Sequence, residues 1–289
     1  ASAKSRCFLA SDRAATSEGL GERLWKGRSF FGVHEVRNDP QRGVHFLKHG
    51  TTIHGAQFTD PGRALRAMSY YHVNGPFGQV FQAIAPTLGH KPVAVVGLGA
   101  GALACHGQSG SAWTFYEIDP LVEKLARDPA YFTYLRDCSP HARVVMGDAR
   151  LTLRSAPPAG FGLIVIDAFT SDAIPTHLLT REAIAGYLAK LAPDGVLLLH
   201  TSNRYLDLIP VIADLATDAG LTGRVSRLGH QGNVEPPASP AQVVVLARRA
   251  ADLATLAGDE AWADLPAPSG RRVWSDSYVN ILSVLKLRL

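Results

Sequence analysis

The stretch "VVGLGAGALA", residues 95–104, places three glycines at alternate positions directly after an apolar run. Gly97, Gly99 and Gly101 permit a tight turn whose backbone approaches a ligand closely, and we expect the next helix to present its N-terminal N–H groups there. Read as G-x-G-x-x-A, the turn would hold a dinucleotide pyrophosphate. Read as G-x-G-x-G, it would hold the adenosyl and sulfonium groups of S-adenosylmethionine. A purely structural turn also stays open.

Apolar runs that flank and follow this turn decide the fold class. From about residue 92 they alternate with helical stretches, and continuous apolar runs are typical of parallel strands buried on both faces. We therefore predict a doubly wound, Rossmann-like α/β domain over residues 86–289. The runs are "VAVVG" (93–97), "WTFYEID" (113–119), "RVVMGD" (143–148), "GLIVID" (162–167), "GVLLLHTS" (195–202) and "AQVVVLARR" (241–249).

The N-terminal segment, residues 1–85, has a different pattern. Residues 28–58 alternate apolar and polar side chains around a turn at Asn38-Asp39-Pro40. This alternation is typical of half-buried antiparallel strands, so we predict a small β domain in this segment.

Composition excludes several classes of protein. The chain has 289 residues, of which 46% are hydrophobic and 19% charged, as expected for a globular domain. Its apolar runs are shorter than the roughly 18 residues that a membrane span requires, and its N-terminus carries no apolar signal core. The net charge is +4 and the isoelectric point is about 9.0, but the basic pairs are isolated. We therefore expect no nucleic-acid partner.

The three cysteines, Cys7, Cys105 and Cys138, are few and widely spaced. Their odd number argues against a disulfide framework and their spacing fits no zinc site, so we expect reduced thiols and no bound metal. His45, His49 and His54 in the β segment are interpreted as packing or surface residues.

Acidic residues follow three consecutive predicted strands, where ligands bind in doubly wound sheets. Glu117 lies 20 residues after Gly97 and can accept hydrogen bonds from ribose hydroxyls, whichever nucleotide is bound. Asp148, in "GDAR", suits the amino group of an adenine, which favours S-adenosylmethionine over a dinucleotide. Both acids have the alternatives of a helix N-cap or a solvated position.

The fourth run ends in "IVIDAFTSDAIPTHLLT". Asp167 follows four apolar residues and Asp172 lies five residues further on. A carboxylate pair there would bind a cation or take a proton from an amine. Helix capping is the alternative for each.

These motifs together resemble spermidine synthase and its aminopropyltransferase relatives, over nearly the whole chain. The resemblance rests on the β segment, on "YYH" at 70–72, and on the glycine turn, "YEID", "GDA" and the Asp-rich loop, in that order. It is stronger still to the spermidine-synthase-like domains fused behind membrane helices in bacteria. The resemblance implies the class I methyltransferase fold, a homodimer, and a cytoplasmic domain attached to the membrane through a segment outside this chain.

The resemblance also implies roles for individual residues. Asp167, Asp172 and Tyr71 would be catalytic, with Asp167 taking the proton from the attacking amine and Asp172 also binding the substrate. His72 would line the polyamine channel. Independently of the resemblance, Asp276 in the C-terminal loop is expected to face the acceptor pocket. The residues expected to bind S-adenosylmethionine or its decarboxylated form are Gln57, Gly97, Gly99, Gly101, Glu117, Asp148 and Ala149.

Two positions depart from the family pattern. Ala100 stands where the family has the Asp that holds the donor's aminopropyl amine, and Val73 stands where it has a Glu. We therefore predict alkylation of an amine or polyamine acceptor with release of methylthioadenosine, and keep two alternatives. One is methyl transfer, or elimination and cyclisation, on the same cofactor. The other is a domain that senses the nucleoside without turnover.

Overall fold

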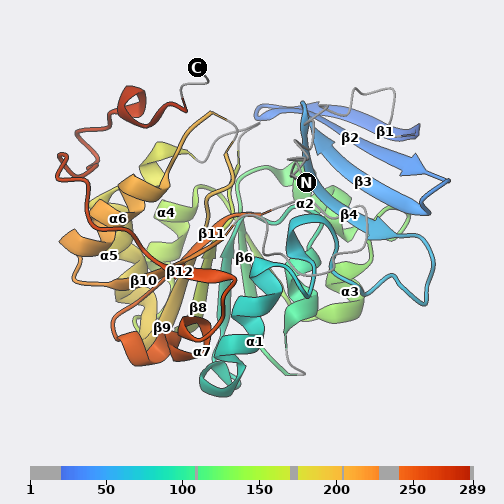
Figure 1. Ribbon diagram of the computed structural model, residues 1–289. Coiled ribbons are helices and arrows are strands. Elements are labelled where there is room, and N and C mark those ends of the chain that lie inside the picture. The colour runs from blue at the N-terminus through green and yellow to red at the C-terminus, as the bar shows by residue number, and fades with distance from the viewer. Residues whose placement is uncertain (1–20, 108–109, 170–174, 204, 228–240, 287–289) are drawn as a thin grey trace, which may run out of the picture.

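The computed structural model describes residues 21–107, 110–169, 175–203, 205–227 and 241–286. Two sheets organise them, a small N-terminal sheet and a large sheet formed by the remainder (Figure 1). Asp172 lies outside the described residues, so its roles stay predictions.

The small sheet confirms the predicted β domain. Its four antiparallel strands follow chain order: β1 (Glu22–Ser29), β2 (Gly32–Asp39), β3 (Val44–His49) and β4 (Thr52–Phe58). The predicted turn follows β2, where the Asp39 side chain accepts hydrogen bonds from the backbone N–H groups of Gln41 and Arg42. On one face of this sheet Val44, Phe46, Ala56 and Phe58 pack with Met68, and on the other Val36 and Leu47 join the core of the large domain.

The large sheet has the order β12-β10-β11-β9-β8-β5-β6-β7. All six predicted runs are strands, and the first five are parallel: β5 (Val93–Val96), β6 (Trp113–Glu117), β7 (Arg143–Met146), β8 (Phe161–Ile166) and β9 (Leu191–His200). The sixth, β11 (Val243–Ala247), is antiparallel to β9, so the prediction of a parallel sheet is wrong at this end. Two strands were not predicted: β10 (Thr222–Ser226) and β12 (Trp262–Asp264).

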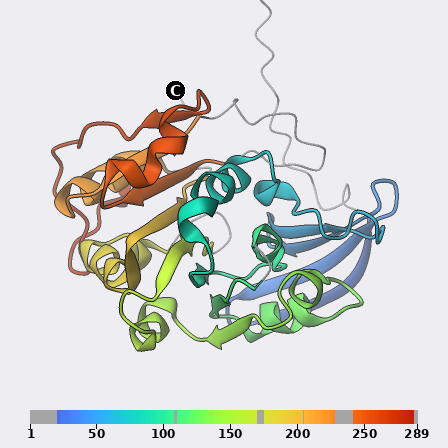
Figure 2. The same ribbon diagram turned by 90° about the horizontal axis from the view of Figure 1, so that it is seen from below.

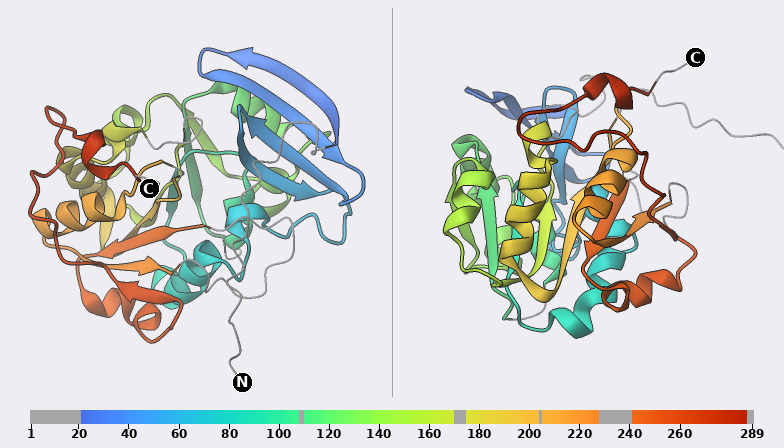
Figure 3. Two further views of the ribbon diagram at one scale, coloured as in Figure 1. Left: turned by 45° about the horizontal axis from the view of Figure 1, so that its top comes forward. Right: turned by 90° about the vertical axis from the view of Figure 1, so that its left-hand side faces the viewer.

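Helices cover both faces of the large sheet, which confirms the doubly wound class (Figure 3). Along β5, Val93 and Val95 belong to one core, whereas Ala94 and Val96 belong to the other. This alternation explains why the strand is apolar throughout. The first core is covered by α1 (Pro76–Leu88), α2 (Pro120–Arg127), α3 (Tyr134–Cys138) and α7 (Ala254–Ala257), and the second by α4 (Ala149–Thr152), α5 (Arg181–Lys190) and α6 (Ile209–Asp218).

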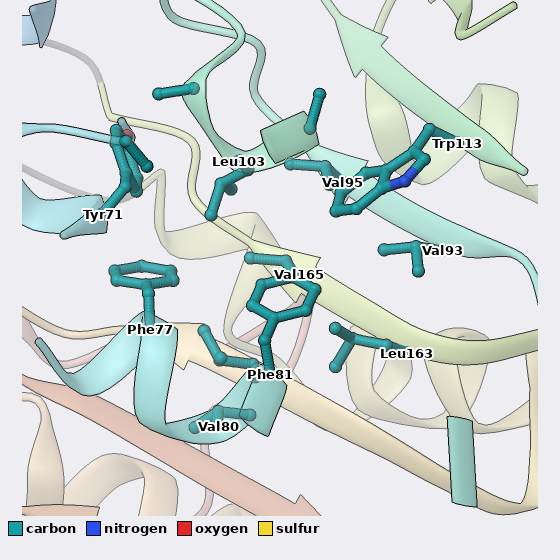
Figure 4. Packing of buried hydrophobic residues seen from close by; sticks show 14 of the residues in the cluster. Tyr71, Phe77, Val80, Phe81, Val93, Val95, Leu103, Trp113, Leu163 and Val165 are labelled. Carbon is teal, nitrogen blue, oxygen red and sulfur yellow. The ribbon is translucent and has the colours of Figure 1, made fainter. Parts of the chain in front are cut away.

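Aromatic side chains from α1 fill the first core. Phe77 and Phe81 are at most 5% exposed, and the Phe81 and Trp113 rings stack 5.8 Å apart. Figure 4 shows Tyr71 and Phe77 side by side at one end of this core, and their ring centroids are 5.2 Å apart. Tyr71 lies on the 3₁₀ turn η2 (Ser69–Tyr71), which leads into α1. The first core thus fixes the position of Tyr71. Figure 2 shows the small sheet, in blue, to one side of the large sheet.

Cys105 and Cys138 form a disulfide, so the expectation of reduced thiols is wrong for these two residues. Cys105 lies on the 3₁₀ helix η3 (Ala102–His106) and Cys138 ends α3, and their Cα atoms are 5.0 Å apart. The pairing could not be read from an odd number of cysteines, because it depends on how η3 and α3 pack together. Cys7 lies outside the described residues.

The C-terminal segment packs two aromatic residues against the large sheet. Trp274 is buried in the second core and Tyr278 packs against it half-buried. The segment is a loop ended by the short 3₁₀ turn η7 (Ile281–Val284). Within the described part of the chain, no helix has the length and apolar character needed to cross a membrane.

Candidate functional site

The glycine turn follows β5 and packs against the protein itself. Gly97, Gly99 and Gly101 all have positive φ, at 97°, 53° and 85°. A Cβ on Gly97 would overlap the backbone of Asp167, and a Cβ on Gly99 would overlap the carbonyl oxygen of His54. Internal packing therefore requires glycine here before any ligand is considered, which leaves the structural alternative for this motif open.

The segment after the turn differs from the expected helix. It is the five-residue 3₁₀ helix η3, whose N-cap is Gly101 in the left-handed conformation. Because a 3₁₀ piece of this length adds little dipole, the prediction of a helix presenting its N-terminus to a ligand is wrong. In the turn itself, the N–H groups of Gly97, Leu98 and Gly101 already donate to Tyr116 O, to the Glu117 carboxylate and to Leu98 O.

Glu117 ends β6 and braces the glycine turn. One of its carboxylate oxygens accepts a hydrogen bond from Leu98 N (3.0 Å), and the other accepts from Ile118 N (2.8 Å) and Asp119 N (2.9 Å). Burial raises the pKa of Glu117, although these N–H donors oppose the shift. The carboxylate is neither a helix cap nor solvated. Three of its about four acceptor positions are used, which leaves one for a ribose hydroxyl.

Asp148 caps α4. Its side chain accepts from Arg150 N (2.8 Å) and Leu151 N (3.3 Å), and its other oxygen lies 3.3 Å from His177 Nε2. These contacts match the capping alternative. Ala149 is buried in the second core. The contact of this pair with adenine stays a prediction.

Asp167 is the centre of the site. It directly follows β8, and its side chain is 5% exposed. Tyr71 Oη donates to Asp167 Oδ2 at 2.6 Å, and His200 Nδ1 lies 2.6 Å from Asp167 Oδ1. His200 Nε2 is in turn 2.9 Å from Ser202 Oγ, which accepts from Gln242 N at 2.8 Å. The structure thus brings two predicted residues together and adds two that the sequence did not reveal.

The hydroxyl of Tyr71 stays protonated in this site. Burial raises its pKa well above 10, and the negative charge of Asp167 acts in the same direction. The neighbouring His106 is a neutral donor that holds Tyr71 in place: its Nε2–H bonds the Tyr71 carbonyl oxygen at 2.6 Å, and burial lowers its pKa to about 4. Tyr71 therefore acts as a fixed donor to Asp167.

The other predicted residues have the following places. Gln57 is buried, and its amide bonds Ala64 O, Thr133 Oγ1 and Thr133 N. His72 is half-buried, and its Nδ1 accepts from Asn74 N at 3.1 Å. Their contacts with cofactor and substrate stay predictions.

Asp276 belongs to a separate group near α4. It is bidentate to Arg150, at 2.5 and 3.0 Å, and accepts from Thr180 Oγ1 at 2.7 Å. Arg150 lowers the pKa of Asp276, which keeps this exposed carboxyl ionised. Its place in an acceptor pocket stays a prediction.

The histidines of the small sheet pack, as interpreted from the sequence. His49 stacks on His34 with ring centroids 4.5 Å apart, and His54 lies 5.4 Å beyond it. His45 Nδ1 lies 3.0 Å from the Tyr131 carbonyl oxygen. In the described ranges, no group of three or more His, Cys, Asp or Glu side chains is placed to hold a metal ion.

Sequence comparison identifies two relatives with names that indicate transfer reactions. A polyamine aminopropyltransferase from Vibrio vulnificus is 33% identical over 114 residues, 38% of this chain and 37% of that protein. An N-terminal histidine N-methyltransferase from Emericella nidulans is 39% identical over 114 residues, 37% of this chain and 19% of that protein. The match thus spans well under half of each relative. No protein-family model matches the chain.

Solved structures share the fold across almost the whole chain. A probable spermidine synthase from Corynebacterium glutamicum superposes with a TM-score of 0.65 at 14% identity, covering 90% of this chain and 98% of that one. Spermidine synthase from Thermotoga maritima gives a TM-score of 0.56 at 18% identity, covering 81% and 75%. The resemblance to aminopropyltransferases is confirmed, because the chain has sequence similarity to one and shares their fold. The fusion to membrane helices stays a prediction.

Proposed function

We propose that this chain is a transferase that holds S-adenosylmethionine, or its decarboxylated form, at the glycine turn and alkylates an amine beside Asp167. The observation that carries the proposal is the direct backbone contact between Gly97 and Asp167. It joins the nucleoside-binding turn to a buried carboxylate at the point where the strand order of a doubly wound sheet reverses. The named relatives support a transfer reaction.

In this proposal, each residue of the site has a separate role. Glu117 holds the ribose with its remaining acceptor position, and Asp148 with Ala149 faces the adenine. Tyr71 and His200 fix Asp167, which accepts a hydrogen bond from the amine and then its proton. The bound sulfonium supplies an activated carbon: the amine lone pair forms the new C–N bond while the C–S electrons return to sulfur.

Methyl transfer is a second candidate, favoured by the surroundings of Ala100. Ala100 is 1% exposed, and a Cβ on Gly55 of β4 would overlap its side chain. Ala100 is therefore buried against β4 and supplies no carboxylate that could pair with an aminopropyl ammonium group. The Emericella relative named as a histidine N-methyltransferase agrees with a methyl donor.

Mass spectrometry of reaction products tests the proposal. The purified protein is incubated separately with S-adenosylmethionine and its decarboxylated form, each with and without putrescine or spermidine. We expect methylthioadenosine only when the decarboxylated donor and an amine are both present, and strongly reduced product formation by Asp167→Asn. Adenosylhomocysteine from the intact donor would establish methyl transfer instead. No turnover of either donor would overturn the enzyme proposal in favour of a nucleoside-sensing domain.

A further inference from the structure

His200 is a buried histidine at the end of β9, next to the strand that carries Asp167. It is 3% exposed. Three aromatic rings surround it: the ring centroids of Tyr70, Phe77 and Phe169 lie 5.3, 5.1 and 4.7 Å from its own. Because these rings restrict the imidazole on several sides, its two nitrogens have defined neighbours.

The hydrogen bonds that connect Gln242, Ser202, His200 and Asp167 can all point toward Asp167, each residue donating to the next. Gln242 N is a backbone donor, so Ser202 Oγ must accept from it. The Ser202 hydroxyl hydrogen is then available to His200 Nε2, and the ring can carry its own proton on Nδ1, facing Asp167 Oδ1. With Tyr71 donating to Oδ2, every described side-chain contact of Asp167 delivers a proton donor to its carboxylate.

From this geometry we infer that His200 is the positioning residue of Asp167: it fixes the orientation of the carboxylate. The inference rests on the proposed function, in which Asp167 accepts the amine proton. His200 Nδ1 and Tyr71 Oη each contact a different oxygen of Asp167, so both carboxylate oxygens are held in place.

Two substitutions separate positioning from simple filling of space. His200→Phe keeps an aromatic ring among its aromatic neighbours but removes the donor to Asp167. His200→Asn loses the ring but keeps an N–H donor near the place of Nδ1, and it cannot titrate. We expect His200→Phe to lower kcat about 100-fold with little change in KM, and His200→Asn to restore most of it. A purely structural role predicts the opposite order and would overturn the inference.

A surface histidine supplies the control for these substitutions. His90→Gln, at an exposed position, should leave both kcat and KM unchanged.

NMR of ¹⁵N-histidine-labelled protein tests the contact without requiring turnover. We expect His200 to carry a proton on Nδ1, facing Asp167 Oδ1, and to change its tautomer equilibrium in Asp167→Asn. A ring protonated only at Nε2 at neutral pH, or one insensitive to Asp167→Asn, would overturn the inference. If no donor is turned over, the proposed function fails, but this measurement still decides the role of His200.

Discussion

The protein contains two buried His–Asp pairs that are nearly alike in geometry. His34 Nε2 lies 2.8 Å from Asp119 Oδ2, and His200 Nδ1 lies 2.6 Å from Asp167 Oδ1. All four side chains are at most 5% exposed. Distance and burial therefore do not distinguish them.

The difference lies in what else each carboxylate does. Asp119 Oδ1 caps α2 by accepting from Leu121 N, and Asp119 Oδ2 also accepts from Ser29 Oγ on β1. This pair therefore ties the small sheet to the large domain. Asp167 caps no helix among the described residues, and its described side-chain partners are only Tyr71 and His200. The comparison shows that burial and pairing with a histidine do not by themselves mark a functional site. What distinguishes Asp167 is that, in its described contacts, it neither caps a helix nor ties the small sheet to the large domain.

The largest expected effect comes from removing the charge of each aspartate in turn. Asp167→Asn should lower turnover by about 10²–10⁴-fold, because the neutral amide cannot accept the amine proton. Asp119→Asn is the matched control and should leave turnover per folded molecule unchanged, because Asn also caps helices well. Product formation measured by mass spectrometry checks both. Equal losses of turnover in Asp167→Asn and Asp119→Asn would contradict the functional difference between the two His–Asp pairs.

The second effect concerns stability. His34→Ala leaves Asp119 buried without its imidazole and removes the stack on His49, so we expect the free energy of unfolding to fall by about 3–5 kcal/mol. Urea denaturation followed by circular dichroism measures it. Turnover of the remaining folded protein should match the wild type; a selective loss of turnover would place this pair in the site.

The smallest expected effect concerns the glycine turn, and it tests whether internal packing or ligand binding requires glycine there. Gly50 and Gly99 have similar positive φ, 59° and 53°, but a Cβ on Gly50 meets open space whereas one on Gly99 overlaps His54. Gly50→Ala should lower the free energy of unfolding by about 1–2 kcal/mol from backbone strain alone. Gly99→Ala should lower it by about 3 kcal/mol, because overpacking adds to the strain. Thermal or urea unfolding of the two variants gives the difference. Equal decreases in the free energy of unfolding would show that position 99 tolerates a side chain. Internal packing would then not explain its glycine, and close approach of a ligand would.

Much of this fold could be predicted from the sequence. Continuous apolar runs marked the central strands, and alternation marked the small sheet, because burial on two faces or on one leaves these patterns. β10 and β12 were missed, since "TGRVS" mixes polar and apolar residues and a three-residue strand has no periodicity. Asp167 and Tyr71 were predictable as site residues, because one directly follows an apolar run and the other belongs to the "YYH" motif.

The missed parts depend on which segments become neighbours in space. His200 ends an apolar run just as Asp167 follows one, yet only the pairing of β9 with β8 brings the two together. Cys105 and Cys138 are 33 residues apart, and the packing of η3 on α3 joins them. Sequence spacing therefore indicated which residues stand at strand ends, but not which of them touch.

Binding of methylthioadenosine, measured by titration calorimetry, tests the central claim most directly. That claim is that a sulfonium nucleoside lies beside Asp167 and is held by Glu117. We predict saturable binding to the wild type, similar binding to Asp167→Asn, and affinity about tenfold lower in Glu117→Gln, because the bond to a charged acceptor is weakened. Absence of binding to the wild type, or equal affinity in Glu117→Gln, would contradict it.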